Sequence, residues 1–203
     1  MIKQYNGAKA QRRAARELLP EGGYIAKILD AQVQHFDYRN GDSADKLILS
    51  FDISEGIYTG FFKKDYNNNT NEDRKWRGVY RYLNIPKDDG SEHDGWAKNT
   101  FNQFIYAIED SNPGYTWAWD ETTLKGKSIG VLFRRFEWEK DGNAGWSTEC
   151  CAVDAVSVIH EGKFKTPKDR PLKRSGSAAT TTSTRTASNS FADLSADDGE
   201  LPF

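Results

Sequence analysis

The order of strand-like and helix-like segments is the feature that most narrows the folds open to this chain. Three strand-like segments come first, a helical stretch follows, and two more strand-like segments close the series. The strand-like segments are residues 24–36, 46–53, 58–66, 127–140 and 146–160. The order predicts a mainly β domain with a helical insertion after its third strand.

Alternation of apolar and polar residues supports the strand assignments most clearly at residues 46–53. Apolar side chains at every second position are the mark of a half-buried strand. The next segment, 58–66, follows Gly56 closely enough to be the partner arm of a hairpin. Residues 141–145, rich in glycine, are expected to join the last two strands as a turn. The apolar face of the second strand consists of Leu47, Leu49, Phe51 and Ile53.

Two helices are expected from spacing and punctuation. A short basic helix over residues 9–19 would end at Pro20. A second helix would open at a capping box of Thr100 and Gln103 and end at residues 112–114. Its apolar residues recur at helical spacing and are Phe101, Phe104, Ile105 and Ile108.

Five strands with a helix between the third and the fourth are typical of the oligonucleotide-binding (OB) barrel. A generic mixed domain of five strands would give the same order. From Arg174 onward the chain is rich in Ser, Thr and Ala, and it has too few large apolar residues to offset its ordering entropy. We therefore expect an OB-like domain over residues 1–165, a flexible linker over 166–196 and a disordered acidic tip over 197–203.

Charge is distributed unevenly, although the net charge is only -2. Residues 160–190 hold seven basic and two acidic side chains, whereas residues 191–203 hold four acidic side chains and no basic one. Such asymmetry is typical of interaction tails. Aromatic residues make up 13% of a chain whose mean hydropathy is -0.78, which indicates that some rings serve a surface.

The sequence indicates a cytoplasmic protein. It has no run of about 18 apolar residues that would span a membrane, and its first residues lack the apolar core of a signal peptide. The two cysteines, Cys150 and Cys151, are adjacent, so they fit small buried thiols in a reducing compartment better than a metal clip.

The strand-like segment 127–140 interleaves cations with rings. If Val131 and Phe133 face inward, the outer face carries Leu132, Arg134, Phe136 and Trp138. Such a face suits unpaired nucleic acid, because bases stack on rings and arginine neutralises phosphates. The alternative is a strand covered on both faces, with its rings in the core and its arginines at the edge.

A second basic and aromatic stretch, residues 61–82, extends the predicted DNA contacts. Residues 74–82 would place rings and arginines at i, i+4 spacing if they were helical. The alternative is a solvated charged face without a ligand. The DNA-binding residues predicted in this stretch are Lys63, Lys64, Trp76, Arg77, Tyr80 and Arg81.

Recognisable catalytic motifs do not occur in the sequence. The residues GKS at 126–128 lack the first glycine of a P-loop, because position 121 is Glu. The histidines are scattered, and no zinc-protease or serine-hydrolase motif is present. We therefore expect a protein that is not an enzyme and needs no metal or cofactor. A metal-dependent nuclease built from Glu137, Glu139 and Asp141 stays an alternative.

The chain ends in "DDGELPF", in which acids precede an apolar Leu-Pro-Phe. A solubilising acidic terminus gives no reason for the last three residues, but a partner's pocket does. A terminal phenylalanine offers a ring and an α-carboxylate together, Pro202 reduces the entropy lost on docking, and the acids steer the segment to a basic surface.

This ending resembles the C-terminal tip of bacterial single-stranded DNA-binding proteins, which end in several Asp residues, an aliphatic residue, Pro and Phe after a flexible linker. Gly199 departs from the usual run of acids. The body, with a large insertion over residues 66–120, resembles more loosely the divergent members carried by bacteriophages and mobile elements. The matching tip residues are Asp197, Asp198, Glu200, Leu201, Pro202 and Phe203.

The resemblance implies an OB fold, binding to single-stranded DNA without strong sequence preference, and a tip that recruits replication, recombination and repair enzymes in a bacterial host cytoplasm. A phage recombination accessory or strand-annealing protein is the first alternative, and the nuclease is the second. An inhibitor that imitates the tip to occupy host pockets is a further one. The sequence is compatible with a homo-oligomer but does not fix the oligomeric state.

Overall fold

The computed structural model describes residues 17–38, 41–70, 72–140 and 142–172. Its five strands form a closed barrel in the order β1-β2-β3-β5-β4, with β4 pairing back onto β1. This is an OB-like barrel, as the order of segments predicts. The strands are β1 (Gly22–Asp37), β2 (Ser43–Ile53), β3 (Val79–Asn84), β4 (Ser128–Lys140) and β5 (Asn143–Asp154).

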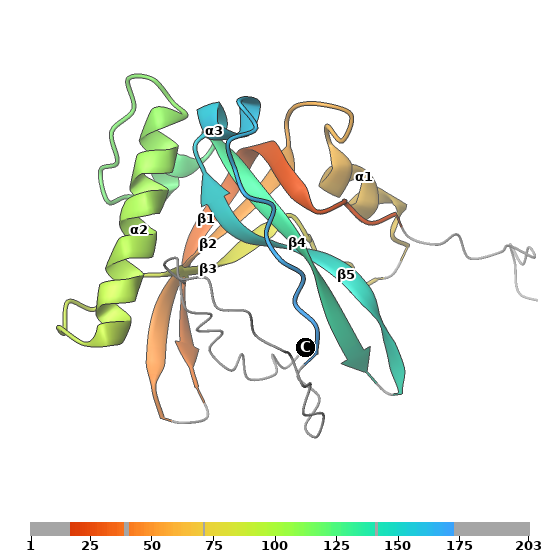
Figure 1. Cartoon of the computed structure of the whole chain (residues 1–203), viewed down its shortest axis with the longest axis horizontal. Helices are drawn as coiled ribbons and strands as arrows, with labels where there is room; N and C mark the ends of the chain where they lie inside the picture. The colour runs from red at the N-terminus through yellow and green to blue at the C-terminus, as the bar shows by residue number, and fades with distance from the viewer. Residues whose placement is uncertain (1–16, 39–40, 71, 141, 173–203) are drawn as a thin grey trace, which may run out of the picture.

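Two antiparallel hairpins, β1–β2 and β4–β5, supply most of the sheet. In the view of Figure 1 both extend beyond the barrel in the same direction. The short strand β3 pairs antiparallel with β2 and meets β5 in parallel at Tyr80 and Cys150, which closes the barrel.

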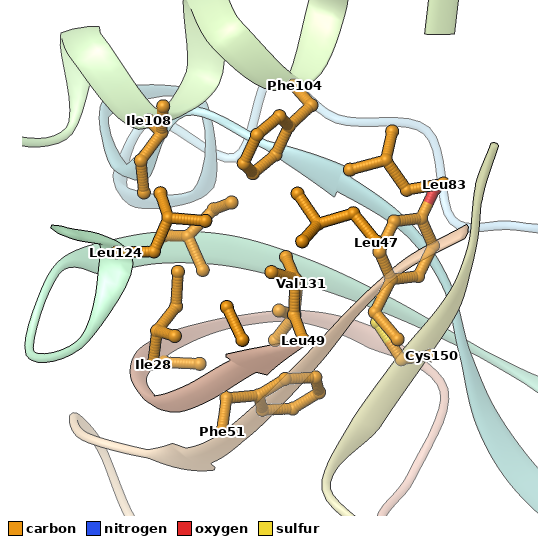
Figure 2. Packing of buried hydrophobic residues seen from close by; sticks show 14 of the residues in the cluster. Ile28, Leu47, Leu49, Phe51, Leu83, Phe104, Ile108, Leu124, Val131 and Cys150 are labelled. Atoms are coloured by element: carbon orange, nitrogen blue, oxygen red, sulfur yellow. The ribbon is translucent and has the colours of Figure 1, made fainter. Parts of the chain in front are cut away.

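The core lies inside this barrel and continues to the helix α2 (Glu92–Asp110), which covers one side of it (Figure 1). Figure 2 shows side chains from the strands meeting those of α2 and of the short helix η1 (Glu121–Leu124). Phe104, Ile108 and Leu124 are fully buried with strand residues such as Phe51 and Val131. The helical insertion thus completes the hydrophobic core.

The start of α2 differs from the predicted one. The helix begins at Glu92, because the side chain of Ser91 accepts a hydrogen bond from the backbone N–H of Asp94 at 3.1 Å. Thr100 lies inside the helix, where its hydroxyl donates to the carbonyl of Trp96 at 3.1 Å. The predicted capping box was wrong, although the apolar spacing that follows it does face the core.

The predicted third strand was also wrong. Residues 61–68 form the helix α1 (Phe61–Asn68), and the third strand is β3. The carboxylate of Asp52 explains the helix start, since it accepts hydrogen bonds from the backbone N–H groups of Phe62 at 2.9 Å and Lys63 at 3.2 Å. The segment 74–82 is not helical, because β3 occupies its second half.

The two ends of the described domain differ from the sequence-based expectation. Residues 9–16 of the predicted N-terminal helix lie outside the described residues, and residues 17–19 are not helical. After β5 the chain forms the short helix α3 (Val156–His160), where a strand was predicted. Residues 164–172, here called the C-terminal strap, then run along β4 (Figure 1). In the described part of the chain, no helix is long and apolar enough to cross a membrane.

Candidate nucleic-acid interface

Strand β4 directs alternate side chains to opposite faces, as its sequence pattern predicts. Val131 is fully buried and Phe133 is 2% exposed, and both belong to the core. On the opposite face Phe136 is half-buried and Trp138 is 38% exposed. The rings of the outer face are therefore not sealed in the interior, although Leu132 on the same face is buried.

The register of the β4–β5 hairpin decides what lies beside these rings. Arg134 pairs with Glu149, Phe136 with Ser147, and Trp138 with Gly145. A β-carbon on Gly145 would lie 3.1 Å from the ring of Trp138, so the glycine lets that ring lie close over the neighbouring strand.

Glu149 connects three strands and the strap on this outer face. Its carboxylate accepts hydrogen bonds from Nε of Arg134 at 2.8 Å, from the hydroxyl of Tyr82 at 2.8 Å and from a guanidinium nitrogen of Arg170 at 3.1 Å. We call this surface the ring–arginine face, and it consists of Tyr82, Arg134, Phe136, Trp138, Glu149 and Arg170.

Two arginines lie beside rings on the ring–arginine face. The guanidinium of Arg134 lies 6.0 Å from the ring centre of Tyr82, and that of Arg170 lies 5.5 Å from the ring centre of Phe136. Burial lowers the pKa of Arg134, but the hydrogen bond and charge of Glu149 outweigh burial and hold that pKa above its ordinary value. Arg134 therefore stays charged, and it shares the Glu149 carboxylate with the guanidinium of Arg170.

The second predicted patch is divided by the structure. Lys63 and Lys64 on α1 are exposed, as are Arg77 before β3 and Arg81 within it. Trp76 is half-buried, and its indole N–H donates to the backbone carbonyls of Phe51 and Gly78 at 3.1 and 3.2 Å. Trp76 therefore stabilises the wall of the barrel by binding the backbone of β2 and of the residue before β3.

Tyr80 corrects the predicted set of DNA-contact residues. Its side chain is 3% exposed and belongs to the core, and burial raises the pKa of its hydroxyl well above the ordinary range. It cannot touch a ligand without unfolding of the wall, and the neighbouring Tyr82 reaches the outer surface instead.

Sequence reasoning missed several residues that flank this surface. At the end of the β1–β2 hairpin, Nζ of Lys46 lies 5.1 Å from the ring centre of Phe36 and 5.6 Å from that of Tyr38. On the other face of the β4–β5 hairpin, Arg135 lies 5.6 Å from the ring centre of Trp146. In OB folds the loops of these two hairpins border the ligand groove. In the sequence, the aromatic residues Phe36 and Tyr38 before Gly41 could have indicated this part of the surface.

The cysteines behave as small apolar residues. Cys150 is buried, and Cys151 is the extra residue that β5 inserts opposite Leu132 and Phe133. Burial raises the pKa of the Cys151 thiol to about 11, so it is protonated at neutral pH. Among residues 17–38, 41–70, 72–140 and 142–172, no group of three His, Cys, Asp or Glu side chains is placed to hold a metal ion.

The predicted partner-binding residues of the tip, 197–203, lie outside the described residues. A scan of protein-family models finds no match to the chain, and a search among curated proteins finds no significantly similar sequence.

Proposed function

We propose that this protein binds single-stranded DNA through the ring–arginine face of its OB-like barrel, without strong sequence preference. The observation that carries the proposal is the outer face of β4, where Arg134 is followed by the half-buried ring of Phe136 and the accessible ring of Trp138, with Arg170 of the strap beside Phe136. Side chains two residues apart on one face of a strand are separated by about 6.6 Å. Rings at that spacing support stacked bases, and arginines beside them neutralise phosphates.

Binding to oligo-dT tests this proposal. The described tryptophans of the β4–β5 hairpin should be quenched as the oligonucleotide is added, and the affinity should fall as salt rises, because phosphate contacts release counterions. A duplex of the same length should bind more weakly, since its bases are not free to stack. Equal affinity for duplex and single strand would contradict the role given to the rings.

We further propose that the C-terminal tip recruits replication, recombination and repair proteins. The support is the sequence pattern of acids followed by Leu201, Pro202 and Phe203. A chain that stops before Ser190 should keep its affinity for oligo-dT and lose the capture of such partners. Loss of both activities on truncation would argue against a tail with a separate task.

A further inference from the structure

We propose that Arg170, which the C-terminal strap holds against β4, forms a phosphate site together with Arg134 across Glu149. The proposal rests on the proposed function, since it assigns a residue of the same face to the DNA backbone. Composition places Arg170 in a flexible linker, and the structure places it on the barrel.

The strap fills an edge that the barrel leaves open. β1 pairs with β4 only from Gly22 opposite Phe133 to Lys27 opposite Ser128, so β4 continues beyond β1 with an unpaired edge. The strap takes that place: the N–H of Arg170 donates to the carbonyl of Arg135 at 2.9 Å, and the N–H of Glu137 donates to the carbonyl of Arg170 at 2.9 Å. Ladder bonds of this kind fix a backbone.

The strap has two further anchors that do not involve the side chain of Arg170. Asp169 binds Arg135 through both carboxylate oxygens, at 3.1 and 2.5 Å. The N–H of Leu172 donates to the Glu137 carboxylate at 3.1 Å. Because the strap is held on both sides of Arg170, the guanidinium is presented on the outer face from a fixed backbone.

Charge indicates why this guanidinium belongs to the binding surface. The barrel's own pair on the face, Arg134 and Glu149, has no net charge, and Arg170 adds the charge that makes the cluster positive. Arg134 binds one oxygen of the Glu149 carboxylate and Arg170 binds the other, so the two cations are held on either side of it. A phosphodiester that passes over Phe136 meets both cations, and arginine is well suited to phosphate.

The same contacts fix the end of the strap. Residue 173 follows Leu172, which is bound beside Glu137 on β4. The strap therefore stays bound to β4 as far as Leu172.

The test is a matched pair of full-length variants, Arg170→Gln and Lys168→Gln. Each removes one positive charge from the strap, and Lys168 is an exposed residue two positions away. For Arg170→Gln we expect about tenfold weaker binding to oligo-dT at moderate salt, and a plot of log K against log salt that is shallower by about 0.7. Lys168→Gln should leave the slope at the wild-type value.

Two outcomes overturn the proposal while the proposed function stands. Wild-type protein that binds oligo-dT, with Arg170→Gln equal to Lys168→Gln in affinity and slope, would remove Arg170 from the site. Tighter binding by Arg170→Gln would make the strap a cover over the face. If wild-type protein binds no oligo-dT, the proposed function itself fails.

Arg170→Lys keeps the test decisive if Arg170→Gln disturbs folding, which thermal unfolding would reveal. Lysine preserves the charge but loses the planar fork. We expect the wild-type salt slope with an affinity between those of wild type and Arg170→Gln. If the salt slope of Arg170→Lys were as shallow as the slope predicted for Arg170→Gln, a role for the charge of Arg170 would be contradicted.

Discussion

Two clusters of rings in the described part of the chain reach the surface, and they differ in the charges around them. The ring–arginine face sets its rings beside guanidinium groups. Beside α2, Trp119 is 71% exposed and stacks on Phe101 with 5.8 Å between ring centres and 5° between planes. We call that second group the α2 ring cluster, and it consists of Phe101, Phe104, Trp117 and Trp119.

The α2 ring cluster lies beside acids. Residues 85–102 hold four acidic and two basic side chains, and Asp120 and Glu121 follow Trp119 directly. Of the two basic residues, Lys98 is held by Asp88 at 2.5 Å and by Asp94 at 2.9 Å. An open pocket of about 370 Å³ beside Trp119 is lined mainly by apolar side chains. The comparison teaches that exposed aromatic area does not identify a DNA surface until the sign of the neighbouring charge is known.

Removing rings should separate the two clusters most strongly. The double variant Phe136→Ala, Trp138→Ala should lose about 1–3 kcal/mol of oligo-dT binding for each ring that stacks a base. Trp119→Gly, which suits the left-handed backbone at that position (φ 59), should bind DNA as wild type does. Fluorescence anisotropy of a labelled oligonucleotide measures both. Equal losses in the two variants would break the distinction between the clusters.

Changing the shared carboxylate should move stability and affinity in opposite directions. Glu149→Gln removes the acceptor charge from two arginine pairs, so the free energy of unfolding should fall by about 1–3 kcal/mol. The same change raises the positive charge of the ring–arginine face and should tighten oligo-dT binding severalfold at low salt. Urea unfolding and anisotropy at two salt concentrations test the pair of effects. Weaker binding by a folded Glu149→Gln protein would contradict this electrostatic account.

Acid should weaken the contact between Asp169 of the strap and Arg135, with a smaller effect on stability than the change at Glu149. The hydrogen bond and charge of Arg135 hold the pKa of Asp169 below its ordinary value of 3.8. The ion pair between Asp169 and Arg135 therefore contributes its full stabilisation when the pH is above the ordinary pKa of the carboxyl. That stabilisation is lost as the pH falls through the lower pKa that Asp169 has in the folded protein. Asp169→Asn should unfold at a slightly lower temperature than wild type near neutral pH, and the difference should close in strong acid. A difference that grows on acidification would contradict the assigned pair.

Much of the barrel could be predicted because its strands are long and regular. β1, β2 and β4 match the predicted segments, since alternation over many residues survives errors at the ends. The third strand could not be found in the same way. Asp52 captures the N–H groups after Gly60 and makes residues 61–68 helical, which is a contact between segments that no local pattern contains.

The site was less predictable because it depends on register and on long-range contacts. A five-residue turn at 141–145 was predicted, but Lys140 pairs with Asn143, which leaves two residues between the strands. That register is what places Glu149 opposite Arg134. The binding of Arg170 to β4 crosses more than thirty residues of sequence and lies in a segment whose composition suggests a linker.

Photo-crosslinking tests the central claim most directly. The full chain would be irradiated with oligo-dT that carries 5-iododeoxyuridine, which forms adducts with aromatic side chains in stacking contact, and the modified peptides would be mapped. The account predicts adducts at Phe136 or Trp138. Adducts at Trp119, or none on β4 under conditions where the oligonucleotide is bound, would contradict it.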